Sequence, residues 1–168
     1  MEINFNNITA QKKEERYQAF LSQYSALIDN EKDVISVLAN TSAALKEAFS
    51  FFWVGFYLVS NKDELVLGPF QGSVACYRIK RGRGVCGTAW SQSKTLIVPD
   101  VNSFPGHIAC SSESKSEIVV PLIWNDEVKG VLDIDSNQLN TFDEIDKIGL
   151  ENVVQILMKT LFNDNNIV

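Results

Sequence analysis

The sequence predicts an α+β domain in which helices pack on an antiparallel sheet of about six strands. Apolar residues recur at helical spacing near the start of the chain and again near its end. Between these stretches, short runs of aromatic and β-branched residues are joined by turn residues, as in hairpins. Hairpins flanked by helices favour a sheet covered by helices over an alternating strand–helix arrangement.

The chain has 168 residues, enough for one domain with a sizeable core, and no linker or repeat divides it. We therefore expect a single domain over residues 1–168. Residues 1–9 show no periodic pattern and are predicted to form a flexible arm.

The composition disfavours two classes of partner. Lys and Arg number 15 against 21 Asp and Glu, and the resulting formal charge of −6 disfavours binding to a phosphate backbone. No apolar run reaches the roughly 18 residues of a membrane span, and the N-terminus lacks the basic and apolar stretches of a signal peptide. We therefore expect a cytoplasmic protein with reduced thiols, which acts without nucleic acid or a membrane.

Three long helices are predicted from apolar spacing and caps. Apolar side chains share one face over residues 17–28 and another over residues 34–49. Asn30 is the expected N-cap of the second helix. The last helix is expected to begin at residues 141–144 (TFDE), which form a capping-box pattern.

The strands are predicted from aromatic and branched residues with turn residues between them. A hairpin over residues 118–124 and 128–134 is expected to turn at Asn125-Asp126. Pro121 in its first arm indicates a sheet edge or a bulge. The other expected elements are strands over residues 53–59, 64–67, 75–79 and 95–98, and a short helix over residues 85–91.

The three cysteines lie outside continuous apolar runs. Cys76 is on the polar side of an alternating run, Cys86 follows a glycine turn, and Cys110 lies in a polar loop over residues 99–117. Core cysteines usually have apolar surroundings, and a loop this long is usually functional. An odd number of cysteines argues against a static disulfide framework. We therefore expect thiol chemistry in which any disulfide is transient.

Residues 82–87 (GRGVCG) match the glycine pattern of dinucleotide-binding loops. Such loops belong to strand–helix–strand units of parallel sheets, whereas the neighbouring strands here are predicted to form hairpins. The glycines therefore indicate a tight turn from a strand into a helix, and no cofactor is expected. Amides at the start of that helix are expected to lower the pKa of Cys86.

A metal site is not expected either. His107, the single histidine, could join the three cysteines in a Cys₃His zinc set, but the cysteines are 10 and 24 residues apart. Structural zinc sites usually pair ligands about two to four residues apart. His107 is therefore predicted to be a loop residue, with the alternative that it helps to form the Cys110 thiolate.

Three carboxyl groups are expected to gather near one end of the sheet. Asp133 and Asp135 lie on one face of a predicted strand, and Glu117 begins its partner arm. With a turn at residues 125–126, paired residue numbers sum to about 251, which places Glu117 opposite Ile134 and next to both aspartates. Such a cluster suits an ammonium ligand or a proton donor with a raised pKa; a solvated sheet face is the alternative.

Trp53, Tyr57 and Trp90 have two interpretations. They could wall a pocket, but core packing is favoured for each of them taken alone.

Seven segments of the chain resemble the free methionine-(R)-sulfoxide reductases, which are single-domain proteins of the GAF fold. Cys86, Cys110 and the three carboxylates named above lie within these segments, and Cys76 lies between two of them; an ordinary GAF sensor domain is not expected to carry this set. The resemblance covers residues 31–160. The segments are LANTS (38–42), VGFY (54–57), GPFQG (68–72), GRGVCGTA (82–89), GHIAC (106–110), SEIV (116–119) and GVLDIDS (130–136).

The resemblance implies a GAF-like six-stranded antiparallel sheet flanked by helices, with a homodimer as a frequent assembly. It implies an oxidoreductase that reduces free L-methionine-(R)-sulfoxide to L-methionine without a cofactor. Cys110 matches the catalytic cysteine, which attacks the sulfoxide sulfur and becomes a sulfenic acid. Cys76 matches the principal resolving cysteine, which closes an intramolecular disulfide, and Cys86 matches the third family cysteine. A thioredoxin-like dithiol would then reset the enzyme.

The same resemblance assigns the carboxylates and two aromatic residues. Glu117, Asp133 and Asp135 match the carboxylates that bind the substrate and handle protons, so Glu117 and Asp135 are also expected to be catalytic. Trp53 and Tyr57 match positions near the methyl end of the substrate. One alternative is a GAF-type sensor that binds a small molecule, or responds to oxidants, without turnover. Another is a structural module with inert thiols.

Overall fold

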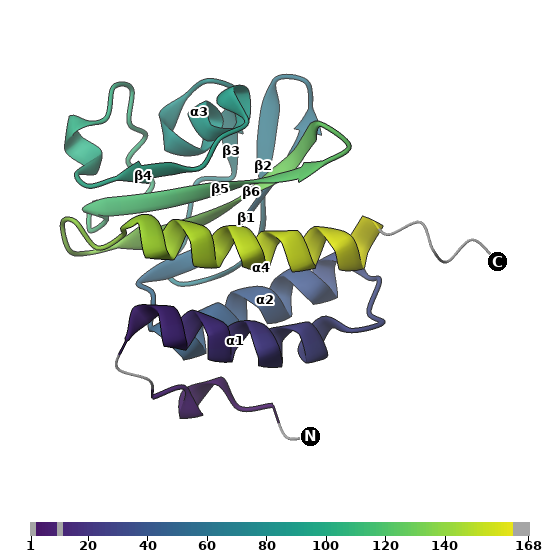
Figure 1. Ribbon diagram of the computed structural model, residues 1–168. Coiled ribbons are helices and arrows are strands. Elements are labelled where there is room, and N and C mark those ends of the chain that lie inside the picture. The colour runs from purple at the N-terminus through teal and green to yellow at the C-terminus, as the bar shows by residue number, and fades with distance from the viewer. Residues whose placement is uncertain (1–2, 10–11, 163–168) are drawn as a thin grey trace.

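The computed structural model describes residues 3–9 and 12–162 of the chain (Figure 1). Six strands form one antiparallel sheet in the order β3-β2-β1-β6-β5-β4, which confirms the predicted α+β class. Helices α1, α2 and α4 lie on one side of this sheet and α3 lies on the other. None of the described helices is long and apolar enough to cross a membrane. The elements are the 3₁₀ turn η1 (Phe5–Asn7), α1 (Lys13–Ile28), α2 (Val34–Phe49), β1 (Trp53–Asn61), β2 (Glu64–Gln71), β3 (Arg78–Lys80), α3 (Gly84–Gln92), β4 (Leu96–Val98), the 3₁₀ turn η2 (Val101–Ser103), β5 (Ser116–Trp124), β6 (Glu127–Ser136) and α4 (Glu144–Phe162).

Side-chain alternation along the central strands builds the core on the helical side of the sheet. Val54 and Phe56 of β1 and Leu132 of β6 face the helices and are buried. Helix α2 packs on β1 and β2 and α4 packs on β5, while α1 packs mainly on α4 and α2. The segment predicted as an arm joins this core over its described part, residues 3–9, because Phe5 is buried there.

Two helix starts differ from the prediction. Asp33, not Asn30, caps α2, because its side chain accepts an amide hydrogen of the first turn at 2.8 Å. Asn30 has a φ of 62° and lies in the turn after α1. The capping box of α4 lies two residues later than predicted. Its members are Asp143 and Asp146, and each carboxylate accepts a hydrogen bond from the other residue's amide, at 3.2 and 3.0 Å.

The sheet also departs from the prediction in places. Only residues 78–80 pair with β2, so β3 is shorter than expected, and Cys76 lies in an irregular segment before it. Pro121 lies on β5 beyond the reach of β4, which pairs only with residues 117–119. Proline has no amide hydrogen to donate, and among the described residues β5 has no neighbouring strand here on the β4 side that would need one.

A bulge sets the register of β5 against β6. Near the turn, Ile123 pairs with Val128, and these numbers sum to 251 as predicted. Beyond the bulge the pairs sum to 252, because β6 has one extra residue there. Glu117 therefore lies opposite Asp135 and not opposite Ile134. Because cross-strand partners share a face, the correction places Glu117 on the same side of the sheet as the aspartates.

Residues 82–87 form the tight turn that the glycine pattern predicted. Gly84 has a φ of 61°, in the left-handed region that favours glycine. Gly87 lets α3 pack closely on β3, because a Cβ at this position would lie 2.3 Å from the carbonyl oxygen of Lys80. Strands β3 and β4, on either side of α3, lie at opposite edges of an antiparallel sheet, so the glycines do not belong to a dinucleotide-binding unit.

Candidate active site

A pocket lies on the face of the sheet that α1, α2 and α4 leave uncovered. Side chains of β1, β5 and β6 form its floor. Its walls are the start of α3, the segment between β2 and β3, and the loop before β5. Seven of the eight site residues proposed from the sequence line this pocket, and the eighth, Cys76, is bonded to one of them. The seven are Trp53, Tyr57, Cys86, Cys110, Glu117, Asp133 and Asp135.

A disulfide between Cys76 and Cys110 joins two walls of the pocket. The two residues are 34 positions apart in the sequence, and their Cα atoms lie 5.3 Å apart. The cavity beneath the disulfide measures ≈ 40 Å³. This space holds a few water molecules and is far smaller than an ordinary ligand pocket. The pocket is therefore nearly closed in the disulfide-bonded form.

Three carboxyl groups meet on the pocket floor. Glu117 and Asp133 are each only 6% exposed, and Asp133 Oδ1 has no hydrogen-bond partner among the described residues. Burial raises the pKa of Asp133 to about 6. Burial, followed by repulsion from the neighbouring carboxylates, raises the pKa of Glu117 and of Asp135 well above their usual range. The cluster therefore retains protons near neutral pH and offers acceptor oxygens to a cation.

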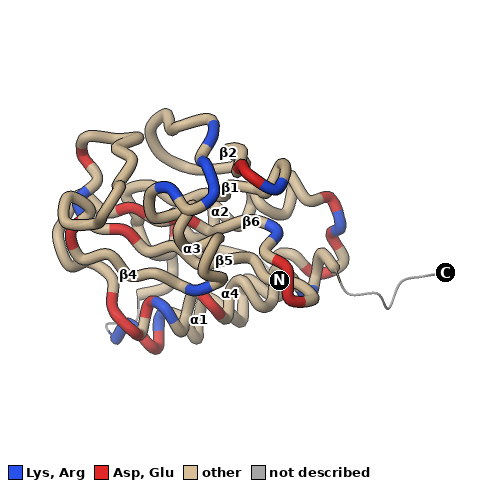
Figure 2. The backbone as a smooth tube through the Cα atoms, turned by 90° about the horizontal axis from the view of Figure 1, so that it is seen from above, with Lys and Arg blue, Asp and Glu red and all other residues tan. Residues whose placement is uncertain are grey.

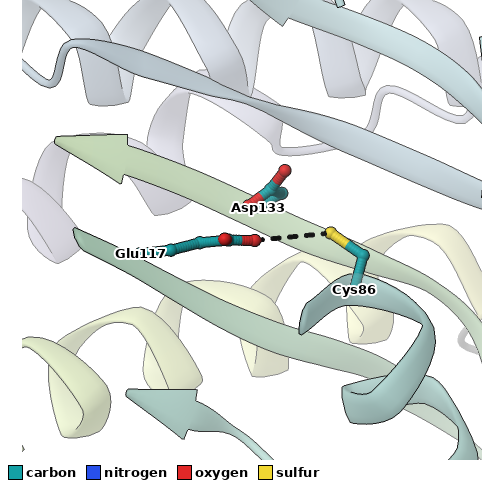
Figure 3. Close-up of side chains that lie close together, drawn as sticks. All are labelled: Cys86, Glu117 and Asp133. Carbon is teal, nitrogen blue, oxygen red and sulfur yellow. Dashed lines mark hydrogen bonds between the residues drawn. The ribbon is translucent and has the colours of Figure 1, made fainter. Parts of the chain in front are cut away.

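Cys86 lies against this carboxyl cluster (Figure 3). Its thiol donates a long hydrogen bond to Glu117, with 3.9 Å between Sγ and Oε1. Burial, followed by the negative charge of Asp133, raises the pKa of Cys86. The expectation that the start of α3 lowers this pKa is therefore wrong, because burial beside carboxylates outweighs the partial charge of a helix terminus. Cys86 is a free, buried thiol in this structure.

Trp53 and Tyr57 form an aromatic wall, with their ring centroids 6.2 Å apart. Trp53 Nε1 donates to the carbonyl of Ser73 at 2.9 Å, and the Tyr57 hydroxyl donates to the carbonyl of Cys76 at 3.0 Å. These bonds fasten the segment that carries Cys76 to the sheet. Trp90 instead packs in the core beneath α3 and does not line the pocket.

Residues 73–75 also line the pocket, although the sequence pattern did not predict this. The residue in the sequence that could have indicated this part of the pocket is Gly72. It has a φ of 140°, and a Cβ at this position would lie 2.5 Å from the Trp53 ring. A glycine at this position lets the chain turn closely over Trp53 and cover the pocket.

Comparison with known proteins places the chain in a family. The GAF domain family matches residues 33–161. The "GAF domain-containing protein A" of Dictyostelium discoideum is 60% identical over 150 residues, which cover 89% of this chain and 95% of that protein. The free methionine-R-sulfoxide reductase of Escherichia coli (strain K12) is 47% identical over 150 residues, which cover 89% of this chain and 90% of that enzyme. This chain belongs to the free methionine-R-sulfoxide reductase family.

A solved structure supports the same family. The X-ray structure of the free methionine-R-sulfoxide reductase from Neisseria meningitidis, in complex with its substrate, is 52% identical. It superposes with a TM-score of 0.88, over 90% of this chain and 92% of that chain. The fold described above is therefore that of a free methionine-R-sulfoxide reductase, a GAF domain protein.

One group in this reductase pocket has the spacing of metal ligands. Cys86, Glu117 and Asp133 each offer a ligand atom, and these atoms lie within 4.8 Å of one another. The Cys₃His set considered from the sequence is not assembled, because Cys76 and Cys110 are joined to each other. His107 lines the pocket, and burial lowers its pKa, so its imidazole is neutral at pH 7.

Because the pocket floor buries three carboxyl groups, we expect the free energy of unfolding of the reductase to fall as the pH rises. A carboxyl whose pKa is raised by folding stabilises the native state fully below its unfolded pKa, and this contribution is lost as the pH rises through the folded pKa. For Asp133 the loss spans about pH 4 to 7 and amounts to roughly 3 kcal/mol, from an unfolded pKa near 4 and a folded pKa of about 6. Urea unfolding at several pH values, with the disulfide intact, should show this decline.

The Asp133→Asn variant should show a shallower decline, because asparagine does not titrate. Asp63→Asn, at the exposed turn between β1 and β2, removes the same charge away from the cluster and serves as the control. Identical pH slopes for Asp133→Asn and the wild type would contradict the assignment of the buried titration to this cluster.

Proposed function

We propose that this protein reduces free L-methionine-(R)-sulfoxide to L-methionine, with two of its cysteines as the source of electrons. The observation that carries the proposal is the Cys76–Cys110 disulfide at the mouth of a pocket floored by buried carboxyl groups. A disulfide is the oxidised product of a dithiol reductase, and carboxyl groups can bind an ammonium and supply a proton. Membership of a family named for this reaction supports the same activity.

The pocket would bind the free amino acid in the reduced form of the protein, because the disulfide-bonded form leaves only ≈ 40 Å³. The ammonium group would lie against the carboxyl cluster, where Asp133 Oδ1 has no hydrogen-bond partner among the described residues. The methyl end would contact the wall of Trp53 and Tyr57, which is buried and apolar.

Reduction would begin with attack of the Cys110 thiolate on the sulfoxide sulfur. A sulfoxide oxygen departs poorly unless it is protonated, so a neutral carboxyl beside it assists. Glu117 and Asp135 suit this role, because burial, followed by repulsion from Asp133, raises the pKa of each. Attack forms a bond between the Cys110 sulfur and the substrate sulfur, and the protonated oxygen leaves as water. Water then attacks the Cys110 sulfur, the sulfur–sulfur bond breaks, methionine leaves, and Cys110 becomes a sulfenic acid.

Cys76 would then attack the sulfenic acid, and water would leave as the Cys76–Cys110 disulfide forms. The two thiols lose two electrons, which match the reduction of one sulfoxide. We assign Cys86 a positioning role beneath this reaction, because its thiol lies 3.9 Å from Glu117 and remains outside the disulfide.

We further propose that a thioredoxin-like protein resets the enzyme by thiol–disulfide exchange. The cytoplasm keeps such dithiols reduced, which suits a cycle of this kind. A homodimer stays a prediction.

Methionine formation from the separate R and S epimers of free methionine sulfoxide, with dithiothreitol as reductant, tests the proposal. We expect turnover of the R epimer alone. In the S epimer the sulfoxide oxygen and the methyl group take each other's positions, so the oxygen would face the aromatic wall and the methyl group would face the carboxyl cluster. Turnover of neither epimer by folded, reduced protein would contradict the proposal and favour a GAF-type sensor.

A further inference from the structure

Exposed apolar side chains flank the disulfide. Val74 is 87% exposed and Tyr77 is 81% exposed, and both lie within two residues of Cys76. The other exposed large apolar side chains among the described residues reach at most 58%. Ile108, two residues before Cys110, belongs to the same exposed group. Apolar side chains gathered at one place on the surface indicate contact with another molecule.

The backbone beneath these side chains is held in place. The carbonyl of Ser73 accepts from Trp53, and the carbonyl of Cys76 accepts from Tyr57. The carbonyl of Tyr77 accepts a backbone hydrogen bond from β2 at 2.9 Å. The segment is therefore fixed from the sheet side while Val74 and Tyr77 extend into solvent. A surface held in this way loses little conformational entropy when a partner binds.

Basic residues lie near this surface along the chain: Arg78 follows Tyr77, and Arg83 precedes Gly84, which lies against Ile108. Arg78, Lys80, Arg81 and Arg83 follow Tyr77 with no acidic residue between them, although the whole chain carries a charge of −6. Arg78 pairs with Glu64 but keeps 59% of its side chain exposed. Blue segments lie beside α3 in Figure 2. A local positive rim favours encounter with a partner whose surface is acidic.

We propose that Val74, Tyr77 and Ile108 form the docking surface for a protein dithiol reductant with an acidic rim. The inference rests on the proposed function, in which the Cys76–Cys110 disulfide must be reduced after each turnover. Transient redox contacts are small, so a few exposed apolar anchors next to the disulfide can carry much of the binding. An aromatic anchor such as Tyr77 is typical of these contacts.

The reaction at this surface is a thiol–disulfide exchange. One thiolate of the partner attacks a sulfur of the Cys76–Cys110 disulfide, the sulfur–sulfur bond breaks, and the other sulfur leaves as a thiolate. The second thiolate of the partner then displaces the enzyme from the mixed disulfide. The partner becomes a disulfide, while Cys76 and Cys110 gain two electrons and two protons.

The test compares two reductants on the same variants. Methionine formation is measured with dithiothreitol and, separately, with increasing thioredoxin kept reduced by thioredoxin reductase and NADPH. For Tyr77→Ser we expect the KM for thioredoxin to rise about tenfold and the rate with dithiothreitol to stay at the wild-type value, because a small thiol needs no docking surface. Val74→Ser should raise the same KM. Ile35→Ser, a 58% exposed residue on α2, is the matched control and should leave both reductants unaffected.

An unchanged KM for thioredoxin in both Tyr77→Ser and Val74→Ser would overturn the docking surface. Wild-type protein that turns over with dithiothreitol but not with thioredoxin would also overturn it and would leave the proposed reductase activity standing. Absence of turnover by the wild type with dithiothreitol would instead remove the proposed function on which the docking surface rests.

Discussion

Replacing Cys110 with serine is expected to abolish methionine formation with either dithiothreitol or thioredoxin. A serine hydroxyl stays protonated at neutral pH and is a far weaker nucleophile than a thiolate. The remaining thiols are also poorly placed to substitute. Cys86 is buried with a raised pKa, and Cys76 without Cys110 has no partner for the disulfide. Purified Cys110→Ser assayed with the R epimer should therefore give no more methionine than a blank without enzyme.

The control for this variant is Ser112→Ala, an exposed neighbour in the same loop, which should keep turnover. Stability should be compared with reduced wild-type protein, because the disulfide itself closes a long loop worth about 3 to 4 kcal/mol. If Cys110→Ser still turned over at the wild-type rate, a different thiol would have to attack the sulfoxide, and the proposed mechanism would be wrong.

Replacing Cys76 with serine is expected to abolish thioredoxin-dependent turnover but to leave one methionine per chain. The Cys110 thiolate can still attack once, after which its sulfenic acid has no thiol with which to condense. Cys86 cannot readily take over, because it lies among the carboxyls of the pocket floor with a raised pKa. Rapid mixing of reduced Cys76→Ser with substrate, free of other thiols, should show a single stoichiometric burst. Dimedone should then label Cys110.

Dithiothreitol separates the two roles. A small thiol can reduce the sulfenic acid directly, so Cys76→Ser should turn over repeatedly with dithiothreitol while Cys110→Ser does not. Loss of even the first turnover in Cys76→Ser would mean that Cys76 attacks the substrate or shapes the pocket. Full thioredoxin-dependent turnover would mean that Cys86 resolves the sulfenic acid.

The sequence was sufficient to predict the elements that carry the site but not their fine alignment. Apolar spacing located the helices over residues 17–28 and 34–49, and turn residues located the hairpin at Asn125-Asp126, because these signals are local. Alternation alone placed Asp133 and Asp135 on one face. Exact helix starts were missed, since neighbouring Asp, Asn and Thr residues compete for the same capping role.

Features that depend on tertiary contacts could not be derived in this way. The direction of the pKa shift of Cys86 depends on how deeply α3 buries it against β5 and β6, and the local turn gives no measure of that depth. The position of Glu117 depends on a bulge whose single extra residue lies in an otherwise ordinary strand pattern. A shift of one residue is invisible to a hairpin prediction, yet it exchanges the two faces of the strand.

The bulge makes the chemistry of the pocket depend on strand pairing at a distant point. Lys129, the unpaired residue of β6, lies opposite a point on β5 about six residues from Glu117, or about 20 Å along the strand. If the bulge closed at constant chain length, β5 would slide by one residue along β6, and Glu117 would lie opposite Ile134 and turn toward the helices. Pairing near the tip of this hairpin therefore decides which face of the sheet carries Glu117. A change at the tip that closes the bulge in this way can disable the pocket of a relative whose site residues are all intact.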